Sequence, residues 1–230
     1  FLLQVFPLSI LGMALGQGLF LFGLRYTSSI NSAILITMIP ILTLLIVVLR
    51  KQEQLTGNKL IGILLAFFGV IFMRDLSGLS FGSQTLWGDL LVFAGALCFA
   101  MYLSYGKKFF MTYDNFWSTT WMFIISGLCM SLFNIDKLGA IDLSEFSTTF
   151  YSCAGFSIFG ATLLTYLLNN WSLKNVSSGS VALFIYLQPL VAGFIGYIFL
   201  NEAITTKMVV CGALIFIGVF VSIKKTHKDA

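Results

Sequence analysis

The chain has 230 residues, of which 58% are hydrophobic and only 10% are charged, with a formal net charge of +4. A soluble domain carries roughly 25% charged residues, so this composition excludes a protein that covers itself with a hydrated surface. The basic residues lie at the ends of apolar segments, which indicates membrane topology and argues against a nucleic-acid-binding surface.

Eight apolar segments follow one another along the chain, and most approach the length of about 20 residues that a helix needs to cross a bilayer. Short hydrophilic joints separate them, so consecutive helices should be antiparallel neighbours. We therefore expect an all-α, polytopic membrane protein without a separate soluble domain. The predicted spans are residues 2–24, 31–49, 59–73, 87–106, 116–133, 149–168, 180–200 and 208–223.

Two parts of the chain repeat each other at a fixed offset of 149 residues. Residues 24–72 align with residues 173–221 without a gap, and 13 of the 49 positions are identical. The matches include Pro40 with Pro189, which a shared apolar composition does not explain. A repeat of this kind in a helical membrane protein indicates a transporter whose substrate site lies where the two copies meet.

The distribution of basic residues predicts that the two copies are inverted relative to each other. With a cytoplasmic C-terminus, nine Lys and Arg residues fall on the cytoplasmic side and four outside, in line with the positive-inside rule. Glu53 and its equivalent Glu202 then lie on opposite sides of the membrane. The predicted organisation is three helices of the first repeat in 1–75, a linker loop at 76–85, a second five-helix repeat at 86–223 and a basic cytoplasmic tail at 224–230.

The second copy has two helices upstream of its matched region, beginning near Leu86, whose counterparts in the first copy would precede Phe1. Completing the repeat requires about 60 further residues, roughly two spans. We therefore expect a ten-helix bundle whose first repeat lacks its first two helices in this sequence.

Residues at both copies of the repeat resemble a known family. The stronger set comprises Ile185-Tyr-Leu-Gln-Pro189, Phe199-Leu-Asn-Glu202, Gly212 and Gly218-Val219, and the weaker set comprises Thr37-Met-Ile-Pro40, Glu53, Gly62 and Gly69-Val70. Both are similar to the EamA-type module of the drug/metabolite transporter superfamily. The resemblance implies ten helices in two inverted five-helix modules, both chain ends in the cytoplasm, and movement of small metabolites. It does not identify the substrate, because members carry amino acids, sugars, nucleotide sugars and drugs.

Polar residues inside the predicted spans are candidates for a substrate site, because burying them unpaired in hydrocarbon is costly. Gln17 and its equivalent Tyr166 occupy matching positions of matching helices. The alternative for each residue is a hydrogen bond that joins two helices. The candidates for a polar, aromatic-rich pocket at the bilayer midplane are Gln17, Thr37, Tyr102, Tyr166, Asn169, Tyr186 and Gln188.

Two prolines are predicted to lie in the middle of helices. Pro40 and Pro189 would each remove a backbone hydrogen bond and kink the helix. Such a kink either flexes beside the cavity or only shapes the packing. Glu53 and Glu202 end their helices at the membrane edge, where a cap or an interfacial anchor is favoured over a role in coupling.

No ionisable residue lies at the centre of a predicted span, which favours exchange or facilitated passage over ion coupling. The sole histidine, His227, lies in the tail, and no enzyme motif, metal site or cofactor site is evident. We expect a carrier in the cell membrane that moves a small metabolite by alternating access. The resemblance alone suggests an amino acid and outward movement. A lipid-linked-sugar flippase-like carrier and a membrane-embedded enzyme are the alternatives, and a homodimer is left open.

Overall fold

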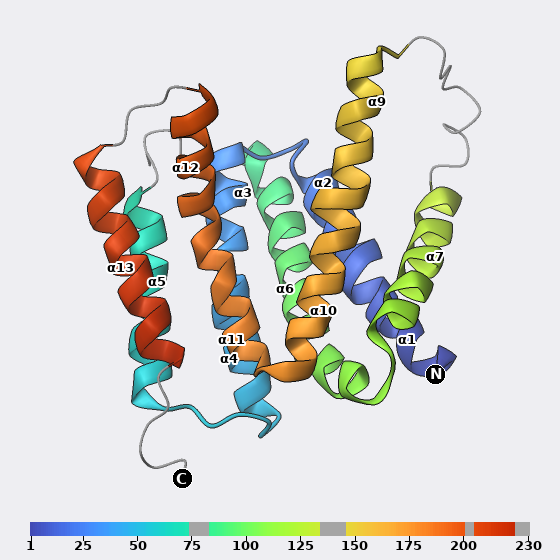
Figure 1. Ribbon diagram of the computed structural model, residues 1–230, viewed down its shortest axis with the longest axis horizontal. Coiled ribbons are helices and arrows are strands. Elements are labelled where there is room, and N and C mark those ends of the chain that lie inside the picture. The colour runs from blue at the N-terminus through green and yellow to red at the C-terminus, as the bar shows by residue number, and fades with distance from the viewer. Residues whose placement is uncertain (74–82, 134–145, 201–204, 224–230) are drawn as a thin grey trace.

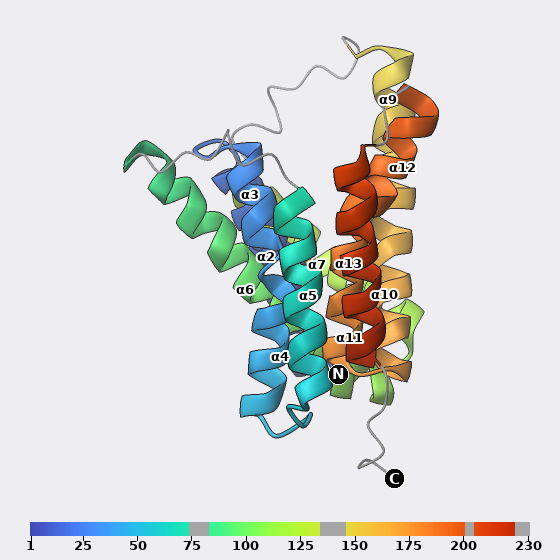
Figure 2. The ribbon, with the colours of Figure 1, turned by 90° about the vertical axis from the view of Figure 1, so that its left-hand side faces the viewer.

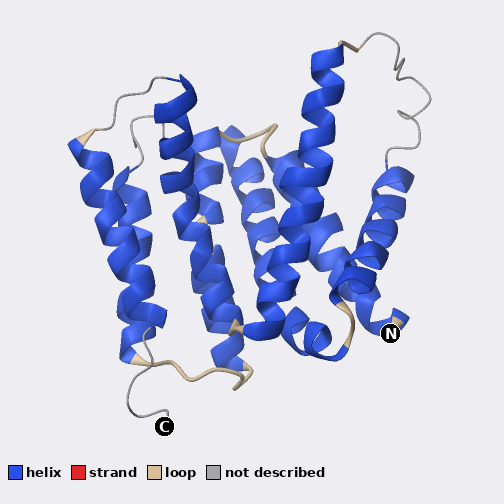
Figure 3. Cartoon of the chain, in the orientation of Figure 1, coloured by secondary structure: helices blue, strands red, loops and turns tan. Residues whose placement is uncertain are grey.

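A computed structural model describes residues 1–73, 83–133, 146–200 and 205–223, and the regular elements in these residues are all helical (Figure 3). Within these described ranges, six helices are long and apolar enough to cross a membrane: Leu2–Gly23, Asn31–Leu49, Thr85–Thr112, Thr148–Asn175, Ser178–Phe199 and Thr206–Ile223. The helices Gly57–Met73 and Asn115–Phe133 lie alongside them (Figure 1). These positions agree with the eight predicted spans.

The first span consists of three pieces, α1 (Leu2–Ser9), the π-helical segment η1 (Ile10–Leu15) and α2 (Gly16–Gly23). The equivalent span of the second copy has the same construction, with α9 (Thr148–Gly155), the π-helical segment η4 (Phe156–Leu164) and α10 (Thr165–Asn175). Figure 1 shows that the two spans run in opposite directions, since α1 and α9 lie at opposite ends of the bundle. Such π-helical turns often occur at functional sites.

The next span of each copy is also discontinuous. The first copy has α3 (Ser29–Ile36) and α4 (Ile39–Leu49), and the second has α11 (Ser178–Leu183), the 3₁₀ segment η5 (Phe184–Leu187) and α12 (Gln188–Leu200). Pro40 and Pro189 each lie in the first turn of the later piece, where a missing N–H needs no intrahelical acceptor. The change of backbone precedes each proline, which is where a proline ring disturbs a helix, and both prolines lie near the middle of the spans Asn31–Leu49 and Ser178–Phe199.

The last helices of the two copies, α5 (Gly57–Met73) and α13 (Thr206–Ile223), pack side by side (Figures 1 and 2). Their backbones approach closely at two glycines. A Cβ atom on Gly218 would lie 2.6 Å from the carbonyl oxygen of Gly62. Only glycine at this point allows the two helices to come so near.

Helix α6 (Ser83–Thr112) packs against α2, α4 and α10, and α7 (Asn115–Phe133) packs against α1 and α10. Figure 2 shows α6 at one side of the molecule and α10, α12 and α13 at the other. The start of α6 makes residues 83–85 of the predicted linker helical. The rest of that linker up to residue 82, Glu202 and the predicted tail at 224–230 lie outside the described residues.

Candidate functional site

Gln17 and Tyr166, which occupy equivalent positions of the two copies, form a hydrogen bond. The Nε2 group of Gln17 donates to Tyr166 Oη at 3.2 Å, and Tyr166 Oη donates to the carbonyl oxygen of Gly12 at 2.8 Å. Each residue lies in the first turn of the helical piece that follows a π-helical segment. The Tyr166 side chain is buried, whereas Gln17 is exposed.

A cavity of about 290 Å³ opens beside this hydrogen bond. Its polar lining consists of Gln17, Tyr166 and Gln188, and the remaining lining is apolar, including Ile36 and Phe99. The lining residues come from helices of both copies. A mostly apolar cavity with a few convergent polar groups is the usual form of a small-molecule site, although this volume lies just below the typical range of about 300–1,000 Å³.

Aromatic rings pack around Tyr166. The centroid of its ring lies 6.2 Å from that of Tyr102, 6.5 Å from that of Phe99 and 5.7 Å from that of Phe123. These rings meet at steep angles, an arrangement that aromatic side chains favour. The hydroxyl of Tyr166 is therefore held at a fixed position on the cavity wall.

A second polar network lies one helical turn away on α10. Tyr102 Oη donates to Asn170 Oδ1, and Asn170 Nδ2 donates to Thr119 Oγ1 at 2.9 Å. Tyr102, Thr119 and Asn170 are all fully buried. This network joins α6, α7 and α10, which is the helix-joining role that the sequence left open for the polar candidates.

The predicted set omitted Asn170 and included its neighbour Asn169. Asn169 is half-buried and does not line the cavity. Because residues four apart lie on one face of a helix, the position of Asn170 relative to Tyr166 was a usable signal for the polar face. The prediction chose Asn169 because it lies three residues from Tyr166, which is also a same-face spacing in a regular helix.

Two other candidates, Thr37 and Tyr186, do not line the cavity. Thr37 is buried, and its hydroxyl donates to the carbonyl oxygen of Ile34 in the preceding turn at 2.6 Å. Tyr186 is fully buried among apolar residues that include Leu44 and Val47, and its hydroxyl has no hydrogen-bond partner within the described ranges. The structure thus brings Gln17, Tyr166 and Gln188 together at the cavity, and Thr37, Tyr102, Asn169 and Tyr186 do not line it.

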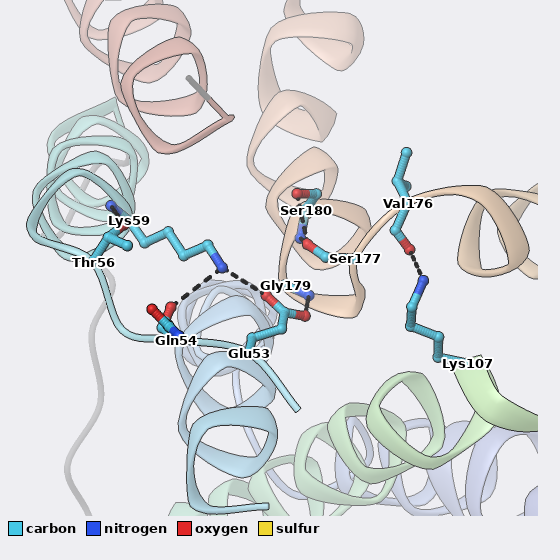
Figure 4. Close-up of polar contacts among 9 residues, drawn as sticks. All are labelled: Glu53, Gln54, Thr56, Lys59, Lys107, Val176, Ser177, Gly179 and Ser180. Atoms are coloured by element: carbon cyan, nitrogen blue, oxygen red, sulfur yellow. Dashed lines mark hydrogen bonds and ion pairs between the residues drawn. The ribbon is translucent and has the colours of Figure 1, made fainter. Parts of the chain in front are cut away.

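Glu53 joins the two copies at one end of the bundle. Its Oε1 atom accepts a hydrogen bond from the backbone N–H of Gly179 at 3.1 Å, and its Oε2 atom lies 3.1 Å from Lys59 Nζ (Figure 4). Gly179 lies in the first turn of α11, where backbone N–H groups lack intrahelical partners and favour a negative charge. Glu53 therefore caps a helix of the other copy, a contact that the sequence alone did not reveal.

The cavity offers amide and phenol groups for hydrogen bonding, and none of its lining residues is ionisable at neutral pH. Across the described part of the chain, no group of three or more His, Cys, Asp or Glu residues is placed to hold a metal ion. The arrangement is suited to binding a small molecule by hydrogen bonds and apolar contacts.

The sequence profile of the EamA-like transporter family matches residues 1–74 and 86–224. The chain belongs to this family. Together with the six helices that are able to cross a membrane, this membership makes the protein a multi-pass membrane transporter. The predicted resemblance to EamA-type modules is confirmed.

Relatives of this EamA-like transporter occur in bacteria, archaea and plants. The uncharacterized transporter YyaM of Bacillus subtilis is 26% identical over 218 residues, covering 92% of this chain and 70% of that protein. An uncharacterized transporter of Archaeoglobus fulgidus is 26% identical over 227 residues, covering 98% of this chain and 78% of that protein. A WAT1-related protein of Arabidopsis thaliana is 25% identical over 257 residues, covering 98% of this chain and 68% of that protein.

A solved crystal structure is similar to this EamA-like transporter in fold. It superposes with a TM-score of 0.83 at 15% sequence identity, covering 95% of this chain and 75% of that chain. At this level of identity the likeness concerns the fold alone.

Proposed function

We propose that this EamA-like transporter carries a small, uncharged or zwitterionic metabolite by alternating access around the cavity that Gln17, Tyr166 and Gln188 line. The hydrogen bond between Gln17 and Tyr166 carries this proposal. Equivalent positions of two copies meet only near the axis that relates the copies. Transporters built from inverted repeats bind their substrates at that interface, near the middle of the bilayer.

Close helix contacts support a two-fold relation between the copies. Gly62 packs on Gly218, and Gly69 packs on the backbone of Cys211. The offset of 149 residues converts Gly62 into Cys211 and Gly69 into Gly218, so each contact is the image of the other. Equivalent helices that run in opposite directions, as in Figure 1, are what an inverted repeat requires.

The chemistry of the cavity narrows the class of substrate. A net charge enclosed without a partner is costly in a low-dielectric site, and the lining offers no opposite charge. Amide groups at Gln17 and Gln188 provide both donors and acceptors of hydrogen bonds. We infer a substrate of the size of an amino acid or a related compound. We further propose that it moves outward across the cell membrane and that the C-terminus of the protein is cytoplasmic.

Counterflow in proteoliposomes tests this proposal. Vesicles that contain the protein are preloaded with millimolar unlabelled neutral amino acids, and the same amino acids are added outside in labelled form. These vesicles should take up the label faster than preloaded vesicles that lack the protein. Tyr166→Phe should lower the initial rate about two- to tenfold, because it removes from the wall of the site the hydroxyl that hydrogen-bonds Gln17 and Gly12. The matched control is Tyr197→Phe, since Tyr197 is exposed on α12 and does not line the cavity.

Two outcomes would contradict different parts of the proposal. Uptake rates that equal those of vesicles without the protein, for every neutral amino acid, would overturn the proposed substrate class. An unchanged rate for Tyr166→Phe, measured in a wild-type protein that does transport, would overturn the assignment of the site.

A further inference from the structure

The turn between α10 and α11 joins two helix ends of opposite polarity. Helix α10 ends at Asn175 and α11 begins at Ser178, so only a short stretch of chain separates them. The last carbonyl groups of a helix and the first N–H groups of the next have no intrahelical partners. They carry partial charges that are negative at the end of α10 and positive at the start of α11.

Lys107 of α6 binds the negative side of this turn. Its Nζ group donates to the carbonyl oxygen of Val176 at 2.7 Å and to that of Leu173 at 3.2 Å (Figure 4). The Lys107 side chain is half-buried. A lysine in this position satisfies unpaired carbonyl groups and opposes the negative end of the helix dipole.

Glu53, between α4 and α5, binds the positive side of the same turn. Its Oε1 atom accepts the backbone N–H of Gly179 at 3.1 Å. A Cβ atom on Gly179 would lie 3.0 Å from Glu53 Oε2, so the absence of a side chain lets the carboxylate approach. Ser178 Oγ also donates to the carbonyl oxygen of Leu103 on α6 at 2.9 Å. The turn is thus held by α6 and by the segment between α4 and α5.

The equivalent turn of the first copy, between α2 and α3, is held by other residues. There Asp89 of α6 accepts hydrogen bonds from the side chains of Thr27 and Asn31. The two turns lie at opposite ends of the bundle (Figures 1 and 2). Substitutions can therefore release one turn without touching the contacts of the other.

The α10–α11 turn is connected to the cavity through both of its helices. Tyr166 lines the cavity and lies in the first turn of α10. Gln188 also lines it and follows α11 through the 3₁₀ segment η5. A movement of the turn therefore shifts two of the polar groups on the cavity wall.

We propose that Lys107 and Glu53 form a charge clamp that closes the α11 end of the cavity and opens during transport. This inference rests on the proposed alternating access, in which the cavity is exposed to each side of the membrane in turn. Each charge binds a backbone dipole of the turn. Both contacts have to break before the turn separates from α6 and from the segment between α4 and α5.

The reactivity of buried cysteines tests the clamp. Val181→Cys on α11 and its equivalent Ser32→Cys on α3 report on opposite ends of the bundle, and both positions are buried. The protein, without its four native cysteines, is placed in nanodiscs, which expose both membrane faces. Lys107→Gln and Glu53→Ala should each raise the rate at which a membrane-impermeant maleimide modifies Val181→Cys about two- to tenfold. The rate at Ser32→Cys should stay unchanged.

Reversal of both charges distinguishes a clamp on backbone dipoles from an ion pair between side chains. A variant with Lys107→Glu and Glu53→Lys should be modified at Val181→Cys at least as fast as Lys107→Gln, because each new charge faces a dipole of the same sign. The matched control is Lys174→Gln, which removes an exposed charge from the last turn of α10. A second control is Asp89→Ala, which acts at the opposite end. Both controls should leave the rate at Val181→Cys unchanged.

Three results would overturn the proposal. An unchanged rate at Val181→Cys in Lys107→Gln and Glu53→Ala would show that these charges do not hold the turn. An equal rise at Ser32→Cys would show a general loss of packing. A wild-type rate in the double reversal would show that the two side chains bind each other. Labelling requires no substrate, so the expected labelling without counterflow would overturn the transport proposal alone.

Discussion

At the level of single residues, the amide of Asn170 connects three helices. It accepts a hydrogen bond from Tyr102 on α6 and donates one to Thr119 on α7. All three side chains are buried, so loss of the amide would leave the Tyr102 hydroxyl without its acceptor. A buried polar group in this state loses its interaction with water and gains nothing in return. Asn170 is thus expected to matter more for stability than for substrate binding.

The neighbouring asparagines allow a matched test of this expectation. Asn170→Ala should lower the free energy of unfolding by about 1–3 kcal/mol, the cost of leaving a buried partner unsatisfied. Asn169→Ala should have a much smaller effect, because Asn169 is half-buried and lies outside the network. Unfolding in mixed micelles with increasing SDS measures both changes. Equal destabilisation by the two substitutions would mean that the network does not stabilise the bundle.

At the level of elements, the segment between α4 and α5 forms a hydrogen bond with the start of α11. Glu53 in this joint accepts the Gly179 N–H and forms an ion pair with Lys59 (Figure 4). The contact links the two copies at the end of the bundle where most basic residues lie. If the copies move relative to each other during transport, this contact has to break when that end opens.

Substitution of Glu53 should therefore make the start of α11 more accessible from solvent. In a chain without its four native cysteines, Glu53→Ala should raise the rate at which a membrane-impermeant thiol reagent modifies Ser180→Cys by about two- to tenfold. Glu53→Gln should fall between, since it keeps an acceptor for Gly179 but loses the ion pair. Gln54→Ala is the control, because the Gln54 side chain is exposed. Identical rates in all variants would show that Glu53 does not restrict access.

At the level of the whole molecule, the orientation of the copies decides the mechanism. Tyr26 and Asn175 are equivalent positions, 149 residues apart, and both are exposed just before the N-caps of α3 and α11. Inverted copies put them on opposite sides of the membrane, whereas parallel copies put them on the same side. The excess of basic residues predicts that Asn175 is cytoplasmic.

Labelling of single cysteines in intact cells distinguishes these arrangements. Tyr26→Cys should react with a membrane-impermeant maleimide added outside, and Asn175→Cys should react only after the cells are permeabilised. Reaction of both positions from the outside would rule out the inverted repeat. The reverse pattern would keep the inversion but turn the whole protein over in the membrane.

The sequence by itself determined the helical spans and the pairing of the two copies. Hydrophobic length identifies spans well because a helix in lipid must satisfy its backbone hydrogen bonds within itself, which is a local property. The repeat offset also singled out Gln17 and Tyr166 as partners, and these residues do touch. Local signals were weaker at the ends of helices, as the earlier start of α6 at Ser83 shows.

Only the tertiary structure decided which polar side chains share a site. A shift of one residue turns a side chain by about 100° around its helix, and the π-helical segments before Gln17 and Tyr166 change that rotation again. Spacing in the sequence therefore favoured Asn169, whereas Asn170 forms the network. The cavity and the Glu53 contact depend on how helices far apart in the chain pack together, and no local pattern encodes that packing.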